Sequence, residues 1–202
     1  MKIKEVTSYT LYDSETTGLD LTEARIVEHG CLRIRDNKIV DSYRTLVNQK
    51  MEVPYGASEI NGITTEMCEK EGIDPKLACE QVINFLGDDI VAGLNNVAYD
   101  FPLLEKECNR YGLPRPKIEN WLDVGTLHKG LALGNLYNQE EMYFKYSTRI
   151  KNIMARGIKF NLNFLVKTYN VENLRDSGIH GAIEDTTMTF HIFNKMKEKY
   201  YL

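Results

Sequence analysis

The chain has 202 residues, of which 43% are hydrophobic and 27% are charged, and its formal net charge is −4. This length suits one domain with a buried core, and the composition is typical of a soluble globular protein. A negative net charge excludes a uniformly basic surface for nucleic acid, so any such binding must be local or must be supported by cations.

Neither a membrane segment nor a secretory leader is expected. No stretch approaches the roughly 18 consecutive apolar residues of a membrane helix, and the N-terminus MKIKEVTSYTLYD lacks the apolar core of a signal peptide. The cysteines stand far apart, without a C-x-x-C pattern, at Cys31, Cys68, Cys79 and Cys108. We interpret them as free thiols in a reducing compartment, and we expect a cytoplasmic protein with no membrane partner.

The first part of the chain predicts three strands in succession. Each is rich in β-branched or aromatic residues, and together they cover residues 6–15, 24–34 and 39–47. The first ends at Thr16-Thr17-Gly18, and Arg35-Asp36-Asn37-Lys38 is typical of a hairpin turn between the other two. A loop that contains Pro54, Gly56 and Gly62 is expected next.

Helices and strands alternate in the remainder. Apolar periodicity and stop signals predict helices over 75–86, 99–111, 164–169 and 182–200. Two short apolar runs, at 90–95 and 121–124, predict buried strands. The core is expected to include Leu103, Leu104, Leu162 and Leu165. A meander followed by this alternation predicts an α/β fold with a mixed sheet.

The segment 129–159 is less regular and is interpreted as a possible insertion. Apolar residues recur on one helical face at Met142, Tyr146, Ile150, Ile153 and Met154. Residues 140–159 include five basic and two acidic side chains, so the segment has a local charge of +3. We favour an amphipathic helix with a solvated basic side, and a contact to phosphates is the alternative.

Two acids lie two residues apart at the end of the first predicted strand. In a strand, Asp13 and Glu15 point to the same face, with Cα atoms roughly 6.5 Å apart. Side by side, their carboxylates repel each other. A hard divalent ion such as Mg²⁺ or Mn²⁺ removes that repulsion and prefers oxygen ligands. For this pattern alone, a solvated acidic pair is the commoner outcome.

Further polar residues fall where α/β sheets place their sites. Asp100 follows a buried strand and begins a helix, although it could simply complement the helix dipole, and Asn96 could simply be a cap. His180 lies five residues before Asp185, so both side chains could face one site. Taken alone, His180 is more simply a loop histidine.

Together these residues resemble the DnaQ-like, or DEDDh, family of 3′–5′ exonucleases. DSETTGL (13–19), GLNNVAYDFPLL (93–104) and HGAIEDT (180–186) are similar to its three motifs, and INGIT (60–64) and LDVGTLHK (122–129) are weaker echoes. A histidine at 180 with glycine at 181 fits the histidine type of the family. The chain departs from the motifs at Asn61 and Asn95, where histidine is common. The resemblance runs from about Ser8 to Phe193.

The resemblance implies a single exonuclease domain over 1–202, with a ribonuclease H-like fold and a mixed five-stranded sheet flanked by helices. It implies hydrolysis from a 3′ end with release of nucleoside 5′-monophosphates. Asp13, Glu15 and Asp185 would bind one divalent ion, Mg²⁺ or Mn²⁺, and Asp13 would bridge to a second. Asp100 would bind directly or through water. His180 would be the general base.

The resemblance also implies contacts with the terminal nucleotides of a single strand. The residues expected there are Thr16, Gly18, Leu19, Ile60, Asn61, Asn96 and Tyr99. Gly18 would allow close approach of the backbone, and the apolar and aromatic members would contact the bases. Each apolar residue could instead belong to the core.

Several functional alternatives remain open at this stage. The polymer could be DNA or RNA, as for an oligoribonuclease or a ribonuclease T-like trimming enzyme, because no residue decides whether a 2′-OH is required. The chain could be a non-catalytic 3′-end-binding module of a polymerase complex, in which case the polymerase would be a partner in trans. A structural metal-binding domain would bind ions without hydrolysis.

Overall fold

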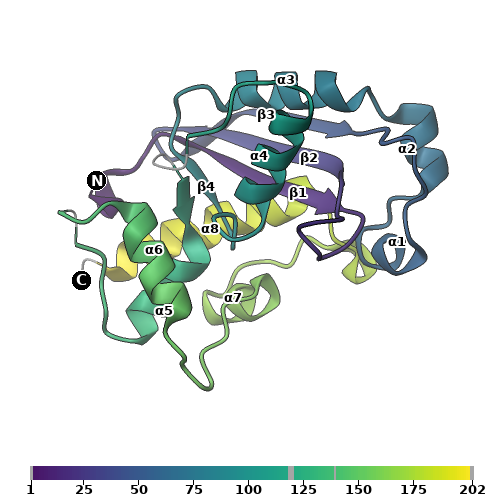
Figure 1. Cartoon of the computed structure of the whole chain (residues 1–202). Helices are drawn as coiled ribbons and strands as arrows, with labels where there is room; N and C mark the ends of the chain where they lie inside the picture. The colour runs from purple at the N-terminus through teal and green to yellow at the C-terminus, as the bar shows by residue number, and fades with distance from the viewer. Residues whose placement is uncertain (1, 118–120, 139, 201–202) are drawn as a thin grey trace.

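A computed structural model describes residues 2–117, 121–138 and 140–200 (Figure 1). Its centre is a five-stranded sheet with the strand order β3-β2-β1-β4-β5. The strands are β1 (Tyr9–Thr16), β2 (Ile26–Arg35), β3 (Lys38–Leu46), β4 (Val91–Gly93) and β5 (Trp121–Asp123). β1 pairs antiparallel with β2 and parallel with β4, so the sheet is mixed, as predicted.

Helices cover both faces of this sheet and connect its parallel strands. They are α1 (Tyr55–Asn61), α2 (Thr65–Glu71), α3 (Pro75–Leu86), α4 (Asp100–Arg110), α5 (Val124–Ala132), α6 (Tyr143–Asn152), α7 (Leu162–Thr168) and α8 (Ala182–Tyr200). α8 runs beneath β1 and β2, whereas α3 and α4 lie over the opposite face (Figure 1). None of the helices in the described ranges is long and apolar enough to cross a membrane.

The central strand β1 is buried on both sides because its side chains alternate between two cores. Leu11 belongs to the larger core, which α5, α6 and α8 cover. Tyr12 points the other way, into a smaller core with Cys31, Leu104 and Trp121. A strand that is packed on both faces holds its carboxyl end rigidly, and that end carries the first acidic motif.

Several predicted elements are confirmed. The hairpin turn places Asp36 and Asn37 at φ values of 49° and 58°, as a two-residue turn of the primed type requires. α3 and α8 have the predicted bounds. The four leucines assigned to the core are buried, and all four cysteines are free and buried.

Other predictions were wrong. The expected loop around Pro54 contains α1 and α2, and Thr64 begins α2 by accepting a hydrogen bond from the Met67 N–H. α5 was not predicted, although Asp123 caps it through the Thr126 N–H. These short helices escape prediction because they have too few turns for an apolar periodicity to stand out.

The helix predicted in segment 129–159 is α6, and it is shorter than the apolar pattern indicated. Tyr146 and Ile150 are buried, whereas Met154 lies beyond the helix and is 98% exposed, so its assignment to the apolar face was wrong. Arg149 and Lys151 are exposed, in agreement with a solvated basic side.

Candidate active site

The carboxyl end of β1 places the first two acids of the site. Asp13 pairs with Gly30 of β2, and Glu15 pairs with Glu28, so the two acids share one face of the sheet. Glu15 is buried and Asp13 is partly buried. The pairing shifts between Glu15 and Thr16, and β1 ends there.

The third acid, Asp100, is the first residue of α4 and is buried. Its Oδ1 accepts hydrogen bonds from the backbone N–H of Ser14, at 3.0 Å, and from the Ser14 hydroxyl, at 2.6 Å. Ser14 lies between the two acids of β1, so these bonds attach α4 to the strand at that point. Sequence reasoning missed Ser14, whose only signal was its place inside the motif.

The fourth acid, Asp185, lies in the first turn of α8. This helix begins close to β2 because Ala182 donates its N–H to Oε2 of Glu28, at 3.1 Å. An ideal Cβ built on Gly30 would lie 2.5 Å from the Cβ of Ala182, so only glycine permits this approach. Neither Glu28 nor Gly30 was singled out from the sequence, because the contact joins segments about 150 residues apart.

His180 lies on the loop before α8, and its backbone N–H donates to the carbonyl of Ile60, at 2.8 Å. Its imidazole is partly exposed, with Nδ1 3.8 Å from Oδ2 of Asp185. One oxygen each of Glu15 and Asp185 and one ring nitrogen of His180 lie within 4.8 Å of one another. The structure therefore brings the predicted histidine to the acids.

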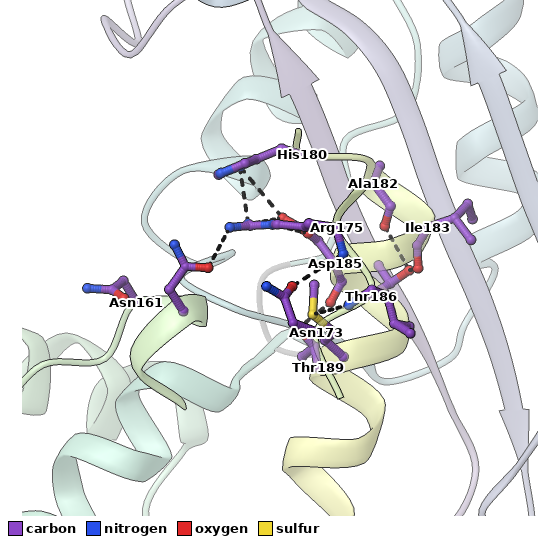
Figure 2. Close-up of polar contacts among 12 residues, drawn as sticks. Asn161, Asn173, Arg175, His180, Ala182, Ile183, Asp185, Thr186 and Thr189 are labelled. Atoms are coloured by element: carbon purple, nitrogen blue, oxygen red, sulfur yellow. Dashed lines mark hydrogen bonds and ion pairs between the residues drawn. The ribbon is translucent and has the colours of Figure 1, made fainter. Parts of the chain in front are cut away.

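Arg175 also reaches this cluster, and the sequence analysis did not identify it. Figure 2 shows its guanidinium between His180 and Asp185. Nε lies 2.8 Å from Oδ1 of Asp185, and Nη2 lies 2.5 Å from Oδ2. Nη2 also lies 3.1 Å from Nδ1 of His180.

The electrostatics of the cluster disfavour negative charge. Burial, and then the charges of the neighbouring acids, raise the pKa of Asp13 well above its ordinary value. The same causes, led by burial, raise the pKa of Glu15 to about 8, and burial raises that of Asp100 to about 7. Burial and the charge of Arg175 lower the pKa of His180. The acids therefore need a nearby cation in order to ionise together.

A cavity of about 500 Å³ opens beside these groups. Most predicted site residues line it, and they are Asp13, Glu15, Thr16, Gly18, Leu19, Ile60, Asn61, Tyr99, His180 and Asp185. Leu19 and Ile60 are 86% and 54% exposed, so their apolar atoms are available to a ligand rather than packed in the core.

Two hydroxyl groups shape the cavity wall beside Gly18. Thr16 Oγ1 and the Tyr99 hydroxyl are 2.9 Å apart. Each also donates to the carbonyl of Gly18, and the bond from Thr16 is 2.8 Å long. The two side chains thus hold the backbone that follows β1 in a defined position.

The two asparagines of the predicted set are engaged differently. Asn61 donates to the carbonyl of Thr16, at 3.2 Å, and accepts from the Ile63 N–H, at 3.0 Å, so it braces α1 against β1. Asn96 is fully buried and is not among the residues that line the cavity. Asp100 is likewise absent from the lining and meets the site through Ser14.

The donor set fits hard divalent cations. Its ligand atoms are carboxylate oxygens, which Mg²⁺ and Mn²⁺ prefer. The raised pKa values of Asp13, Glu15 and Asp100 show that negative charge there is under-compensated. The guanidinium of Arg175 already occupies part of the place that a cation would take.

Comparisons with known proteins agree with this geometry. The family model RNase_T, described as "Exonuclease", matches residues 10–193. A PolC-type DNA polymerase III from Thermotoga petrophila is 28% identical over 95% of the chain, which covers 15% of that protein. The epsilon subunit of DNA polymerase III from Aquifex aeolicus is 23% identical over 95% of the chain and 81% of its own length.

Among solved structures, E. coli exonuclease I in complex with a dA16 oligonucleotide is similar, with a TM-score of 0.75. The match covers 96% of this chain and 41% of that one, at 15% identity, so it shows the shared fold. The chain spans only a small part of the PolC-type polymerases that it resembles.

Proposed function

Because this chain belongs to the RNase_T exonuclease family, we propose that it hydrolyses single-stranded DNA from the 3′ end and releases nucleoside 5′-monophosphates. One observation carries the proposal. Asp13, Glu15, Asp100, Asp185 and His180 come from three separate segments and converge where β1 ends, and all of them except Asp100 line the open cavity. A binding module without catalysis would not need this set of acids and a base.

In this proposal the four acids, Asp13, Glu15, Asp100 and Asp185, bind two divalent ions, Mg²⁺ or Mn²⁺. When bound, such ions lower the pKa of water and offset the charge of a phosphate. The acids of this chain ionise readily only when a cation offsets their mutual repulsion. The two hydrogen bonds from Ser14 fix the orientation of the Asp100 carboxylate before any ion binds.

His180 is proposed as the general base. Its backbone bond to Ile60 fixes the loop, and its partly exposed ring can reach a water in the cavity. Its lowered pKa keeps the imidazole neutral at pH 7, as a proton acceptor must be. One ring nitrogen would take the proton of the attacking water.

Thr16, Gly18, Leu19, Ile60 and Tyr99 are proposed to hold the terminal nucleotides. The exposed side chains of Leu19 and Ile60 offer apolar surface to the bases, a mode of contact that tolerates any sequence. The Thr16 and Tyr99 hydroxyls hold the backbone at Gly18, so the sugar can approach that backbone closely. Asn61 supports this wall. Asn96 is fully buried outside the cavity lining, so its side chain is not proposed to touch the nucleotide.

Single-stranded DNA is proposed as the substrate because the related proteins are named as DNA polymerases or were solved with a DNA oligonucleotide. The same names support a DNA polymerase as a partner in trans. We further propose that residues 1–202 form one domain in which 129–159 is an insertion, since one sheet organises the chain and the family match runs across that segment.

The proposal is tested by digestion of matched 5′-labelled single-stranded DNA and RNA with Mn²⁺, with Mg²⁺ and with EDTA. A ladder that shortens from the 3′ end with either ion, and not with EDTA, is expected. Asp13→Ala should abolish it, whereas Asp41→Ala, on exposed β3, should not. Faster cleavage of RNA would reassign the substrate, and binding of 3′ ends without cleavage would leave a binding module.

A further inference from the structure

Arg175 is an unusual neighbour for a cation-binding site, because it is itself a buried cation. Its side chain is only 4% exposed, and both oxygens of Asp185 accept hydrogen bonds from it. Its third nitrogen, Nη1, donates to Oδ1 of Asn163 on α7, at 2.9 Å. The guanidinium is therefore held by Asn163 of α7 on one side and by Asp185 of α8 on the other.

The contact with His180 has a chemical consequence. A guanidinium has donors and no acceptor, so Nη2 must donate to Nδ1 of His180, 3.1 Å away. A neutral imidazole that accepts at Nδ1 carries its hydrogen on Nε2. In this arrangement neither ring nitrogen is free to accept a proton from water.

The guanidinium of Arg175 thus donates hydrogen bonds to two groups of the site at once, the carboxylate of Asp185 and the imidazole of His180. Nε and Nη2 each take one lone pair of an Asp185 oxygen, so a divalent ion must either share this carboxylate with the guanidinium or displace it. Two cations beside the same carboxylate would also repel each other. The guanidinium therefore opposes loading of the ion, and movement of Arg175 away from Asp185 would also release Nδ1 of His180, which Nη2 contacts in Figure 2.

We infer that Arg175 is a built-in counter-ion that competes with the divalent cation for Asp185 and keeps His180 inactive until the cation binds. Arg175 is a positioning residue, since it acts through Asp185 and His180 and not on the substrate. The inference rests on the proposed function of the site as a metal-dependent nuclease. Its consequence is that the base becomes competent only when the ion is in place.

The bond between Arg175 and Asn163 offers a milder way to weaken the competition. The backbone of the segment is fixed independently, because the Leu174 N–H donates to Sδ of Met188, at 3.5 Å. Removal of Asn163 would therefore leave the ion pair with Asp185 but take away one anchor of the guanidinium. The Asn163→Ala variant should weaken the competition without abolishing it.

The test is titration calorimetry of Mn²⁺ into the full chain without nucleic acid. Arg175→Gln is expected to bind Mn²⁺ roughly tenfold more tightly or better, the scale of the charge-assisted hydrogen bonds that the metal-free state loses. Asn163→Ala should give a smaller increase. Arg149→Gln removes the ion pair between Arg149, on the exposed side of α6, and Glu141, which precedes that helix; it is the matched control and should bind as the parent does.

Two further measurements separate this role from a purely structural one. The unfolding temperature of Arg175→Gln in EDTA should fall, and Mn²⁺ should raise it by more than it raises that of the parent. Nitrogen-15 spectra of the metal-free parent should show the His180 hydrogen on Nε2, and Mg²⁺ should change this preference.

The outcomes are distinct. If the parent binds Mn²⁺ and both Arg175→Gln and Asn163→Ala bind it with the same affinity, the competition is refuted while the metal site stands. If Arg175→Gln does not fold, the Mn²⁺ affinity of Asn163→Ala and the His180 spectra of the parent still test the competition. If the parent binds no Mn²⁺ at all, the proposed function itself fails.

Discussion

The hydroxyl of Ser14 lies 2.6 Å from Oδ1 of Asp100, and the backbone N–H of the same serine lies 3.0 Å from that oxygen. Both groups donate to it, so the strand that carries Asp13 and Glu15 also orients the acid at the start of α4. Burial raises the pKa of Asp100 to about 7, and the two bonds from Ser14 oppose that rise.

Removal of the Ser14 hydroxyl should therefore make Asp100 harder to ionise. In Ser14→Ala we expect its pKa to rise by about one unit, because hydrogen bonds to charged groups contribute about 1.5–3 kcal/mol. Mn²⁺ affinity and cleavage should fall at pH 7 and recover toward pH 8.5. Mn²⁺ affinity and cleavage rate would be measured against pH for Ser14→Ala and for the exposed Ser42→Ala. Superimposable profiles for the two variants would contradict the prediction.

The raised pKa values predict how stability depends on pH without metal. Glu15 and Asp100 ionise at about 8 and about 7 in the folded chain, but near pH 4 when unfolded. The folded state therefore binds more protons between these values, and the free energy of unfolding falls as pH rises from about 4 to 8. The loss is on the order of a few kcal/mol.

Thermal unfolding in EDTA should thus show a lower midpoint at pH 8 than at pH 5, and Mn²⁺ should restore much of the difference. Asp13→Asn removes one charge from the cluster, so it should flatten the pH dependence and raise the midpoint at pH 8 while it abolishes cleavage. A midpoint that is constant over this range in EDTA would show that the acids are solvated.

Gly18→Ala separates substrate contact from stability. An ideal Cβ at Gly18 meets no atom within 4 Å, so alanine should leave the unfolding temperature unchanged. If the terminal sugar approaches this backbone closely, KM for single-stranded DNA should rise by roughly tenfold, equivalent to 1.4 kcal/mol. Gly56→Ala, with similar open space on the cavity wall, should leave KM near that of the parent. Equal KM values would place the nucleotide elsewhere.

Much of this architecture could be predicted from local sequence. The strand pattern and turn chemistry of residues 6–47 predicted the meander and hairpin, and the three acidic motifs indicated an exonuclease family that the match to residues 10–193 confirms. The mixed five-stranded sheet is confirmed as well. These features depend on patterns within a few residues, where alternation and turn preference act directly.

The missed features are contacts between distant segments. Gly30 looks like an ordinary strand glycine until α8 approaches it, and Arg175 looks like a surface arginine until its loop folds over Asp185. A side chain's burial and charge partners depend on the tertiary arrangement, which no local pattern encodes. Met154 shows the opposite error, since its apolar spacing continued beyond the point where α6 ends.

The segment that carries Gly18 and Leu19 is held from outside the site, by an ion pair between Arg25 and Glu107 of α4. Nε of Arg25 lies 2.6 Å from Oε1 of Glu107, and Nη2 lies 3.1 Å from Oε2. The N–H of Arg25 donates to Oγ1 of Thr17, at 3.0 Å, so the pair closes the loop onto β1.

Glu107 is almost completely buried, and its removal would leave a charged guanidinium without its partner. Glu107→Ala should lower the free energy of unfolding by about 3–5 kcal/mol, the usual cost of breaking a buried pair. The urea concentration at the midpoint of unfolding should fall. KM for single-stranded DNA should rise, because the segment with Gly18 and Leu19 is held less firmly. Asp88→Ala breaks an exposed pair with Lys117 and should change neither quantity measurably. Equal urea midpoints for the two variants would show that the buried pair contributes no more than an exposed one.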